Sequence, residues 1–474
     1  MRDKLFEDFR ATSKSDWMEQ VLKDLKGKSF EDTLISQAEG GIHIKPFYTR
    51  EDLGAEFPLS TIHNQVNPIP SLPGLSPRQW SNTVRVAVGE QNEVSENKKL
   101  INALQTGADG LVLSLTGKED LAVLLKDVEP SYIQIFIEPK DHVLNVAEVF
   151  EAWLESKNVD LNDVIGGFLW DPATVSLTLE FYRSEGLEVI KKLLVQFEKY
   201  PNFKTFTIDF AHYHHAGGLS FQELSYGFGA FLEHVDRLTE EGVSLELIFK
   251  NVLLKSAVGS DFFLEIVKLK VARMLIFQIA NLFKHKLDPK SIPFYVQTSY
   301  WSKSKFDMDT NMLRNTTEAM SAIIGGCTAL EVLPHDLSMG SSRDFASRMA
   351  RNVSSILKEE AYLDKVLDPA AGSYYIEKLA EELFNRVING ILTVDAEGGW
   401  WSMSSLHDIQ AEIKETRSQR QDELISGQSV KVGVNKYKQE KANASIDDES
   451  EMFDYQLNWS RHALKYELLN SSNS

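Results

Sequence analysis

Short apolar runs alternate with longer amphipathic segments from Trp80 to about residue 361. The short runs are rich in β-branched and aromatic residues, which is typical of buried strands, whereas the longer segments repeat apolar residues three and four positions apart, as helices do. Each strand has a helical pattern behind it. Eight such strands are predicted, at residues 83–89, 110–116, 131–139, 164–171, 203–211, 245–254, 293–301 and 328–336.

Continuous apolar strands that alternate with helices indicate a parallel sheet covered by helices. Eight units favour an α/β fold of the closed (β/α)8, or TIM, barrel type over residues 79–361. An open doubly wound sheet is the alternative, because the segment that precedes Phe203 is not cleanly delimited.

Two further regions flank the predicted barrel. Residues 1–78 contain one helical pattern, at 16–27, and a Pro-rich tract, HNQVNPIPSLPGLSP. The tract predicts an extended arm that lies on a surface, with a partner's surface as one candidate. A disordered linker is the alternative. Residues 362–474 are mainly helical, with helices expected at 374–392 and 406–427, a strand at 430–435 and a polar tail.

Composition narrows the classes of function. A net charge of -19 argues against nucleic-acid binding, which needs basic clusters, but leaves room for a small anionic ligand in a local cationic site. The first residues lack the apolar segment of a secretory signal, and no run is long and apolar enough for a membrane span. The single cysteine, Cys327, lies in an apolar setting that favours an inert thiol. The expected compartment is the cytoplasm.

Histidines cluster in DFAHYHHAGGLSF, residues 209–221, directly after a predicted strand and therefore at the mouth of the barrel. If the backbone stays extended, His212 and His214 point to the same side, as a metal pair would. A third ligand would then come from another strand end. Alternatively, His214 acts as a general acid or as a donor to a carbonyl, or the histidines are simply satisfied by neighbours. The candidate third ligands are Asp209, Asp171 and Asp336.

The segment QTSYWSKSK, residues 297–305, places small polar side chains at another strand end. Ser299 is therefore a candidate for the lining of a ligand channel. Serine and threonine also pack inside barrels, so the composition of this segment leaves both interpretations open.

Several strings occur in an order that closely resembles the adenosylcobalamin-dependent methylmalonyl-CoA mutase family. They are IKPFYTREDL, DFFLEIVKLKVAR, QTSYW, RNTTEAMSAIIGG, RDFASRMARN, LDPAAGSYYIEKLAEEL, DAEGGW and VGVNKY. The resemblance implies a barrel that threads an acyl-CoA along its axis and a separate domain that carries cobalamin. It implies the radical conversion of methylmalonyl-CoA to succinyl-CoA.

The chain also departs from the family pattern. None of its eleven histidines has an aspartate two residues before it, so the Asp-x-His-x-x-Gly motif that supplies the lower cobalt ligand is absent. Leu75, Leu337 and Asn251 stand where the resemblance implies a tyrosine, a glutamate and an arginine. SLTGKED, residues 114–120, replaces a segment that follows the second strand.

The resemblance therefore implies the small, non-catalytic subunit of a heterodimeric mutase, with a larger partner chain that holds adenosylcobalamin. No catalytic residue is expected, His214 being a vestigial candidate, and no metal. Acyl-CoA remains a possible ligand. Two alternatives stay open: a catalytic barrel whose cobalamin domain is a separate polypeptide, and a metal-dependent lyase. The candidates for a substrate channel are Trp80, Tyr213, His214, Gln297 and Ser299, and Gln297 is also the candidate that faces the cofactor.

Overall fold

The computed structural model describes residues 12–53, 75–87, 92–178, 183–288, 292–340, 342–438 and 456–471. Most of the predicted Pro-rich arm, residues 54–74, lies outside these ranges. Among the described residues, none of the helices is of a length and apolarity that would let it cross a membrane.

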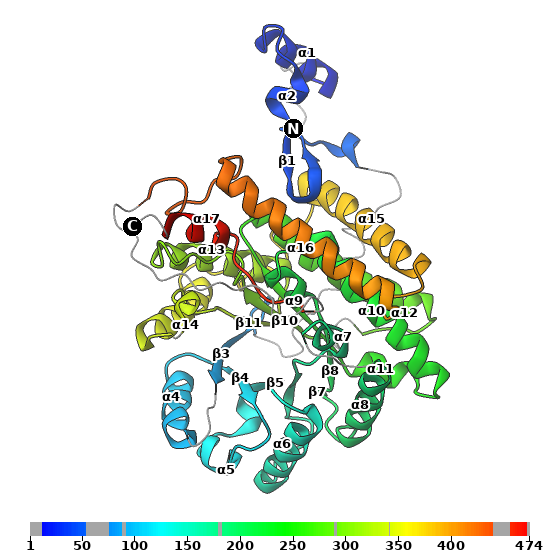
Figure 1. Cartoon of the computed structure of the whole chain (residues 1–474), viewed down its shortest axis with the longest axis vertical. Coiled ribbons are helices and arrows are strands. Elements are labelled where there is room, and N and C mark those ends of the chain that lie inside the picture. The colour runs from blue at the N-terminus through cyan, green and yellow to red at the C-terminus, as the bar shows by residue number, and fades with distance from the viewer. Residues whose placement is uncertain are drawn as a thin grey trace, which may run out of the picture.

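The centre of the molecule is a parallel barrel, as the alternating pattern predicts (Figure 1). Its strands are almost entirely buried because helices cover the outside and neighbouring strands fill the inside; all six residues of β4, for example, are buried. The strands are β3 Ser81–Ala87, β4 Gly110–Leu115, β5 Gln134–Pro139, β6 Ile165–Phe168, β7 Phe203–Lys204, β8 Phe206–Asp209, β9 Val252–Val258, β10 Phe294–Thr298 and β11 Ala329–Glu331.

The barrel closes through β7 and β8, which form one stave interrupted at Thr205. β7 pairs with β6, and β8 pairs with β9. Beyond the interruption, Thr207 still donates its backbone N–H to the carbonyl of Trp170 at 2.9 Å. Nine strand segments therefore make eight staves without a free edge, which confirms the predicted (β/α)8 fold and excludes the open sheet.

Helices follow the strands around the outside of the barrel. The described helices of this region are α4 Glu93–Gln105, α5 Leu121–Leu124, α6 Val143–Lys157, α7 Pro172–Ser176, α8 Arg183–Gln196, α9 Phe210–His215, α10 Ser220–Glu240, α11 Leu245–Lys250, α12 Phe262–Leu282, α13 Thr310–Gly325 and α14 Asp344–Glu359, with short 3₁₀ turns η3 Pro130–Tyr132 and η5 Leu337–Met339.

Two sequence predictions need correction here. The sixth strand was expected at 245–254, but residues 245–250 form α11, because Ser244 accepts the Leu247 N–H and caps a helix of good helix formers. The strand itself, β9, runs from 252 to 258. The segment before Phe203, in which the sequence pattern does not cleanly delimit a strand, contains the helices α7 and α8.

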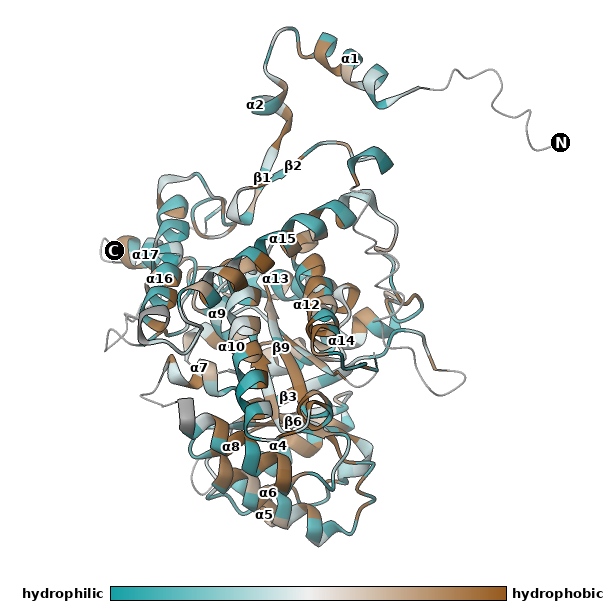
Figure 2. Cartoon of the chain, turned by 90° about the vertical axis from the view of Figure 1, so that its right-hand side faces the viewer, coloured by the Kyte–Doolittle hydropathy of each residue, from teal (hydrophilic) through white to brown (hydrophobic). Residues whose placement is uncertain are grey.

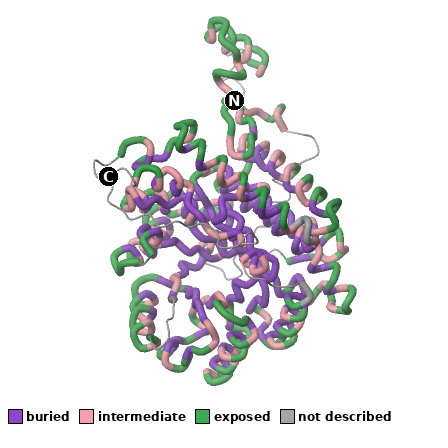
Figure 3. Tube along the Cα trace, viewed as in Figure 1, coloured by how far each residue is buried: buried purple, intermediate pink, exposed green. Residues whose placement is uncertain are grey.

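The N-terminal region stands away from the barrel (Figures 1 and 2). It consists of α1 Lys14–Asp24, α2 Phe30–Leu34, the hairpin β1 Ser36–Ala38 and β2 Ile42–Ile44 with its turn η1 Glu39–Gly41, and η2 Arg50–Asp52. Neither α1 nor α2 contains a buried residue, and Figure 3 shows their exposure. The hairpin docks through Glu39, which pairs with Arg420 at 3.2 Å on the later helix of residues 403–426 and accepts the Ser220 N–H at the start of α10.

The C-terminal region covers one side of the barrel mouth with α15 Tyr374–Ala396, α16 Met403–Ser426 and α17 Leu464–Ser471. The two long helices match the predicted ones. The strand expected at 430–435 is wrong: this segment is a tight turn in which the carbonyl of Lys431 accepts three successive N–H groups, and its one bridge joins Val432 and Lys436. The expected polar tail is partly helical, as α17.

Candidate functional site

The interior of the barrel is filled by a layer of apolar side chains. They come from six staves around the circumference and form one cluster, in which the rings of Phe136 on β5 and Tyr295 on β10 meet from opposite sides of the barrel with 5.0 Å between centroids. Because strand residues alternate between faces, their sequence neighbours point outward into the helix layer. The members of this layer are Val112, Phe136, Leu169, Leu253, Tyr295 and Ala329, none more than 5% exposed.

A polar layer lies above the apolar one, toward the carboxyl ends of the strands. Its centre is Arg85, which donates to Glu138 Oε2 at 2.7 Å and, through Nε and a terminal nitrogen, to the two oxygens of Glu331 at 2.7 and 3.0 Å. Glu331 also accepts from the Tyr295 hydroxyl and, at 2.5 Å, from the Gln297 amide. These contacts join β5, β3, β11 and β10, which lie along one side of the barrel.

The electrostatics of this layer keep Arg85, Glu138 and Glu331 ionised. Burial disfavours the charged form of Arg85, but the carboxylates of Glu138 and Glu331 outweigh burial and raise its pKa. Burial likewise raises the pKa of Glu331, whereas Arg85 lowers it more, so that the net shift is downward. One guanidinium shared by two carboxylates therefore forms a charged plug that is stable over the physiological pH range.

A cavity of about 1190 Å³ opens above this plug. Arg85, Glu138, Gln297 and Glu331 belong to its lining, and so does Trp459. Its walls come from α4 and from residues 333–351, and include Leu337. In a barrel enzyme this is the face where substrates bind, so the cavity is the natural place to look for a reaction centre. Its inner end meets the plug and not an open axis.

The histidine cluster is helical, contrary to the extended backbone on which the metal prediction depended. Asp209 accepts the His212 N–H at 3.1 Å and caps α9, which carries all three histidines. On a helix, residues two apart point in different directions, so His212 and His214 do not form a His-x-His pair. Burial lowers the pKa of His212 to about 4.

Among the described residues, no three side chains of the types His, Cys, Asp and Glu lie close enough to hold a metal ion. Two of the proposed third ligands have other partners: Asp209 pairs with Lys255 at 2.7 Å, and Asp336 pairs with Arg343 at 2.9 Å. Asp171 accepts the Asp209 N–H at 3.0 Å, and burial raises its pKa to about 7. The lyase alternative is therefore not carried further.

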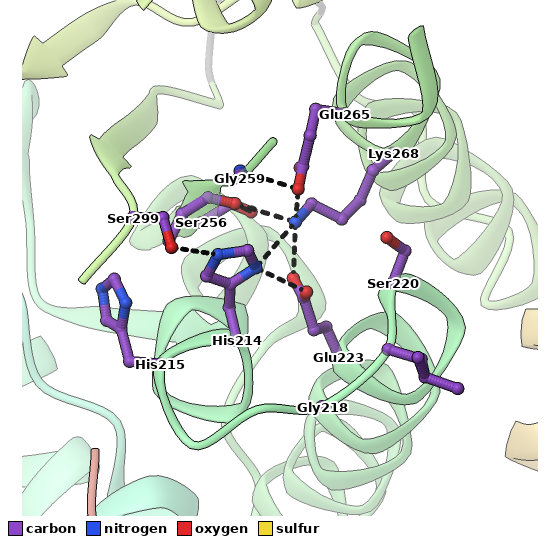
Figure 4. Close-up of polar contacts among 12 residues, drawn as sticks. His214, His215, Gly218, Ser220, Glu223, Ser256, Gly259, Glu265, Lys268 and Ser299 are labelled. Carbon is purple, nitrogen blue, oxygen red and sulfur yellow. Dashed lines mark hydrogen bonds and ion pairs between the residues drawn. The ribbon is translucent and has the colours of Figure 1, made fainter. Parts of the chain in front are cut away.

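His214 belongs to a buried network that reaches across four elements (Figure 4). Its Nδ1 lies 2.8 Å from Glu223 Oε1, and its Nε2 lies 2.8 Å from the Ser299 hydroxyl. Lys268 forms ion pairs of 2.7 Å with both Glu223 and Glu265. Burial, and then the charge of Lys268, lower the pKa of His214 well below its ordinary value. The imidazole is therefore neutral.

The network contains two carboxyl groups and one ammonium. Burial raises the pKa of Glu223 and of Glu265, while Lys268 lowers both to a smaller extent. Two buried carboxylates beside a single cation share one proton near neutral pH, since both cannot ionise without leaving one charge uncompensated. The chemical capacity of this arrangement is to hold and exchange that proton.

Ser299, His214 and Glu223 stand in the order of a hydroxyl, a base and a carboxylate, which is the order used in nucleophilic catalysis. The Ser299 hydroxyl is fully buried and already accepts the Ser302 N–H at 3.1 Å. A nucleophile must reach its substrate, so this hydroxyl serves as a packing contact in the present arrangement.

The remaining channel candidates are also held by protein partners. Gln297 accepts from His215 at 3.4 Å, and the His215 ring packs on Trp459 with 4.1 Å between centroids. Trp80 donates to the Ser354 hydroxyl at 2.9 Å on the helix side of the barrel. Tyr213 is fully buried. The structure thus brings His214 and Ser299 together, places Gln297 in the plug, and separates Trp80 from both.

Sequence reasoning missed the residues that organise this site. Arg85 stands in the apolar run TVRVAVG, and Glu331 stands in TALEVLPHD. A lone charge at an inward position of a buried strand signals a partner inside the barrel, so these two were detectable. Glu223, Glu265 and Lys268 lie on helices, where polar residues are expected on the solvent face, and only the packing of α10 against α12 shows that they are buried.

The fold and the site therefore define a TIM barrel whose axis is closed by its own side chains. The family model described as methylmalonyl-CoA mutase matches residues 102–458. This chain belongs to the methylmalonyl-CoA mutase family, which confirms the resemblance seen in the sequence.

Among curated relatives, the methylmalonyl-CoA mutase small subunit of Porphyromonas gingivalis is 29% identical over 92% of this chain and 71% of its own length. The small subunit of Streptomyces virginiae is 27% identical, covering 88% and 67%, respectively. The mitochondrial mutase of Bos taurus is 27% identical over 91% of this chain but 61% of its own length. The chain thus spans about two thirds of these relatives.

The shared proton makes stability depend on pH through Glu265. Burial raises its pKa to about 8, from an ordinary value of 4.5, so the folded chain keeps a proton that the unfolded chain loses. Its contribution is favourable below about pH 4.5 and declines as the pH rises toward 8. We predict that the unfolding free energy of the native chain, relative to Glu265→Gln, falls by about 1 kcal/mol per pH unit between pH 5 and 8.

Urea unfolding at four pH values in this window measures that difference. The exposed Glu198→Gln is the control, and its difference from the native chain stays flat. A Glu265→Gln difference that stays equally flat would mean that Glu265 is ionised throughout and that no proton is shared.

Proposed function

We propose that this chain is the non-catalytic small subunit of a heterodimeric, adenosylcobalamin-dependent methylmalonyl-CoA mutase. A longer homologous partner would bind the cofactor and carry out the conversion of methylmalonyl-CoA to succinyl-CoA. Family membership and the similarity to small subunits support the proposal. The cytoplasm is the expected compartment for a chain with one buried cysteine, Cys327, whose pKa is raised by burial to about 12.

The closed barrel axis carries the proposal. The resemblance implies that an active mutase threads its acyl-CoA along this axis, and here the axis holds the apolar layer and the Arg85 plug. Admitting a pantetheine chain would require Phe136 and Tyr295 to leave a packed core, and Arg85 to leave two carboxylates. Breaking a buried ion pair costs about 3–5 kcal/mol, and large apolar side chains cost a similar amount each.

The positions that depart from the family pattern support the same conclusion. Leu75 is half exposed, and Leu337 lines the mouth cavity with an apolar side chain. Asn251 donates its side-chain amide to the Leu247 carbonyl at 2.9 Å and so serves the end of α11. None of the three offers the charge or hydroxyl that the resemblance implies for substrate or cofactor contact.

The described residues do not fit a bound cobalamin. The resemblance implies a histidine that ligates cobalt from below, and the sequence has no Asp-x-His-x-x-Gly motif. At the barrel mouth, His214 and His215 are both engaged with protein partners. We therefore assign adenosylcobalamin to the partner chain, and no step of the reaction to this one.

The N-terminal region is the proposed contact with the partner. Trp17 packs against Phe47 at 5.0 Å and against Phe30 at 6.4 Å, but Phe47 stays 41% exposed and the neighbouring Leu22 50% exposed. An apolar cluster of this kind on a projecting arm is typical of an interaction surface. The homologous large subunit is the occupant to which the proposal commits.

Removal of residues 1–53 is predicted to abolish the heterodimer while the barrel stays folded. This deletion ends before Arg78, which is buried against the carbonyl of Leu367 and belongs to the barrel. Size-exclusion chromatography with the large subunit measures assembly, and thermal unfolding of the truncated chain controls for folding. A complex that elutes intact with the truncated chain would contradict the proposal that the N-terminal region contacts the large subunit.

A catalytic barrel served by a separate cobalamin protein is the second candidate, and the Ser299–His214–Glu223 alignment favours it. We predict that Ser299→Ala leaves turnover of the assembled complex within about two-fold, because the hydroxyl touches no substrate.

Ser302→Ala is the matched control, because its hydroxyl bonds Glu318 and not His214. If the aligned Ser299, His214 and Glu223 take part in turnover, Ser299→Ala lowers kcat by about a hundred-fold, whereas Ser302→Ala does not. Turnover by this chain mixed only with a small cobalamin-binding protein would likewise favour the second candidate.

A further inference from the structure

Lys431 is a buried lysine without a counter-ion. The residue is 6% exposed, and no hydrogen bond or ion pair of its ammonium is found within the described part of the chain; the ammonium is not among the fully enclosed unpartnered atoms and opens onto the cavity that it lines. The backbone around it is fixed, since its N–H donates to Asn435 Oδ1 at 2.7 Å and its carbonyl accepts from the turn that follows. A buried ammonium that lacks a partner is costly, so its retention points to a ligand.

Lys431 lines a second cavity, of about 510 Å³, that is separate from the cavity above the Arg85 plug. Its lining comes from the segments after β9 and β10, from α13 and α16, and from the chain before α17. Its charged lining residues are the cations Lys431, Arg314 and Arg420 and the carboxylates of Glu39, Asp261 and Glu265; two histidines, His214 and His462, also face it.

The carboxylates of this lining are already engaged. Glu39 pairs with Arg420 at 3.2 Å, and Glu265 pairs with Lys268 at 2.7 Å. Asp261 caps α12 by accepting the Leu264 N–H at 3.3 Å. None of them is within ion-pair distance of Lys431.

Arg314 is the second cation without a carboxylate. Its terminal nitrogens donate to two neutral acceptors, Asn311 Oδ1 at 2.7 Å and the Val432 carbonyl at 2.6 Å. These contacts fix the plane of the guanidinium and leave three of its five N–H groups for a ligand. Lys431 and Arg314 therefore form a pair of like charges that is held in place by neutral groups.

The charges of the lining act on one another. Burial, and then Arg314, lower the pKa of Lys431 well below its ordinary value; Glu318 and Glu467 oppose this shift only in part, because they are paired with Lys303 and Arg461. Burial, and then Lys431 and Arg420, lower the pKa of His462 to about 3, so this histidine is neutral. It donates its Nε2–H to the Arg420 carbonyl at 2.9 Å. An anion bound between Lys431 and Arg314 would offset the repulsion between their positive charges.

We propose that Lys431 and Arg314 bind a small oxyanion, a phosphate or a carboxylate group, in this second cavity. A guanidinium presents a planar fork to two oxygens, and an ammonium adds a point charge, which is the usual protein donor set for these groups. The site is independent of the proposed role as a mutase subunit, because neither Lys431 nor Arg314 belongs to the Arg85 plug or to the N-terminal region.

Binding of inorganic phosphate and of acetate to the full chain tests the proposal, with isothermal titration as the measurement. We expect saturable 1:1 binding of at least one of the two, and competition identifies whether phosphate or carboxylate is preferred. Because the anion raises the pKa of Lys431, the ammonium takes up a proton on binding. With acetate, which stays ionised throughout the neutral range, affinity therefore rises as the pH falls, and the measured heat depends on the ionisation enthalpy of the buffer.

Lys431→Met keeps the apolar stem and removes the charge. It is expected to weaken binding by about ten- to a hundred-fold, the effect of losing a charge-assisted contact. Lys126→Met, which removes an exposed lysine far along the chain from this cavity, is the control and binds like the native chain. Melting temperatures without ligand check folding, and Lys431→Met should melt no lower than the native chain.

Binding of neither anion, or equal binding by native chain and Lys431→Met, would overturn the proposal. Weak binding that does not saturate and is shared by all variants would overturn it too, because such binding reports general surface charge.

Discussion

Three charged side chains meet inside this barrel, and their contact limits which ligands its interior can admit. Arg85 on β3 joins Glu138 on β5 and Glu331 on β11, and the apolar layer lies directly beneath them. These groups join strands on one side of the barrel, and Phe136 on β5 packs against Tyr295 on β10 from the other side, so that side chains fill the space that a substrate chain would need. In a barrel that is stabilised in this way, the axis cannot serve as a binding channel.

The charged groups around the plug follow one rule, which is that each buried charge has a partner that fixes its state. Arg85 stays ionised between two carboxylates, and Lys268 holds Glu223 and Glu265 around one shared proton. His214 is neutral because burial and Lys268 both oppose its protonation. Lys431 departs from this rule, and that departure makes the cavity beside it informative. The structure thus distinguishes groups that serve stability from one that awaits a ligand.

Much of the fold follows from the sequence, because strands buried on both faces and helices with one apolar face have different periods. The stave of β7 and β8 closes the barrel through backbone bonds on both sides of Thr205, which no local pattern reveals. The segment 245–250 was mistaken for a strand because a short apolar run fits either element, and the Ser244 cap decides for a helix.

The site was less accessible to sequence reasoning. His214 and Ser299 were singled out, and they touch, yet the extended backbone assumed for the histidines is a helix capped by Asp209. Arg85 was a detectable signal, but its partners depend on how far β5 and β11 are staggered around the barrel. Glu223 and Lys268 are 45 residues apart on two helices, and only their packing brings them together.

Binding of coenzyme A to the isolated chain tests most directly whether the axis is closed. Isothermal titration of the Lys431→Met chain, in which the oxyanion site does not contribute, with CoA and with methylmalonyl-CoA should show no saturable binding up to about 1 mM, since the energy of opening the core exceeds what the ligand gains. Tight 1:1 binding that disappears when Ala329 is replaced by phenylalanine would place the ligand on the axis and contradict the account.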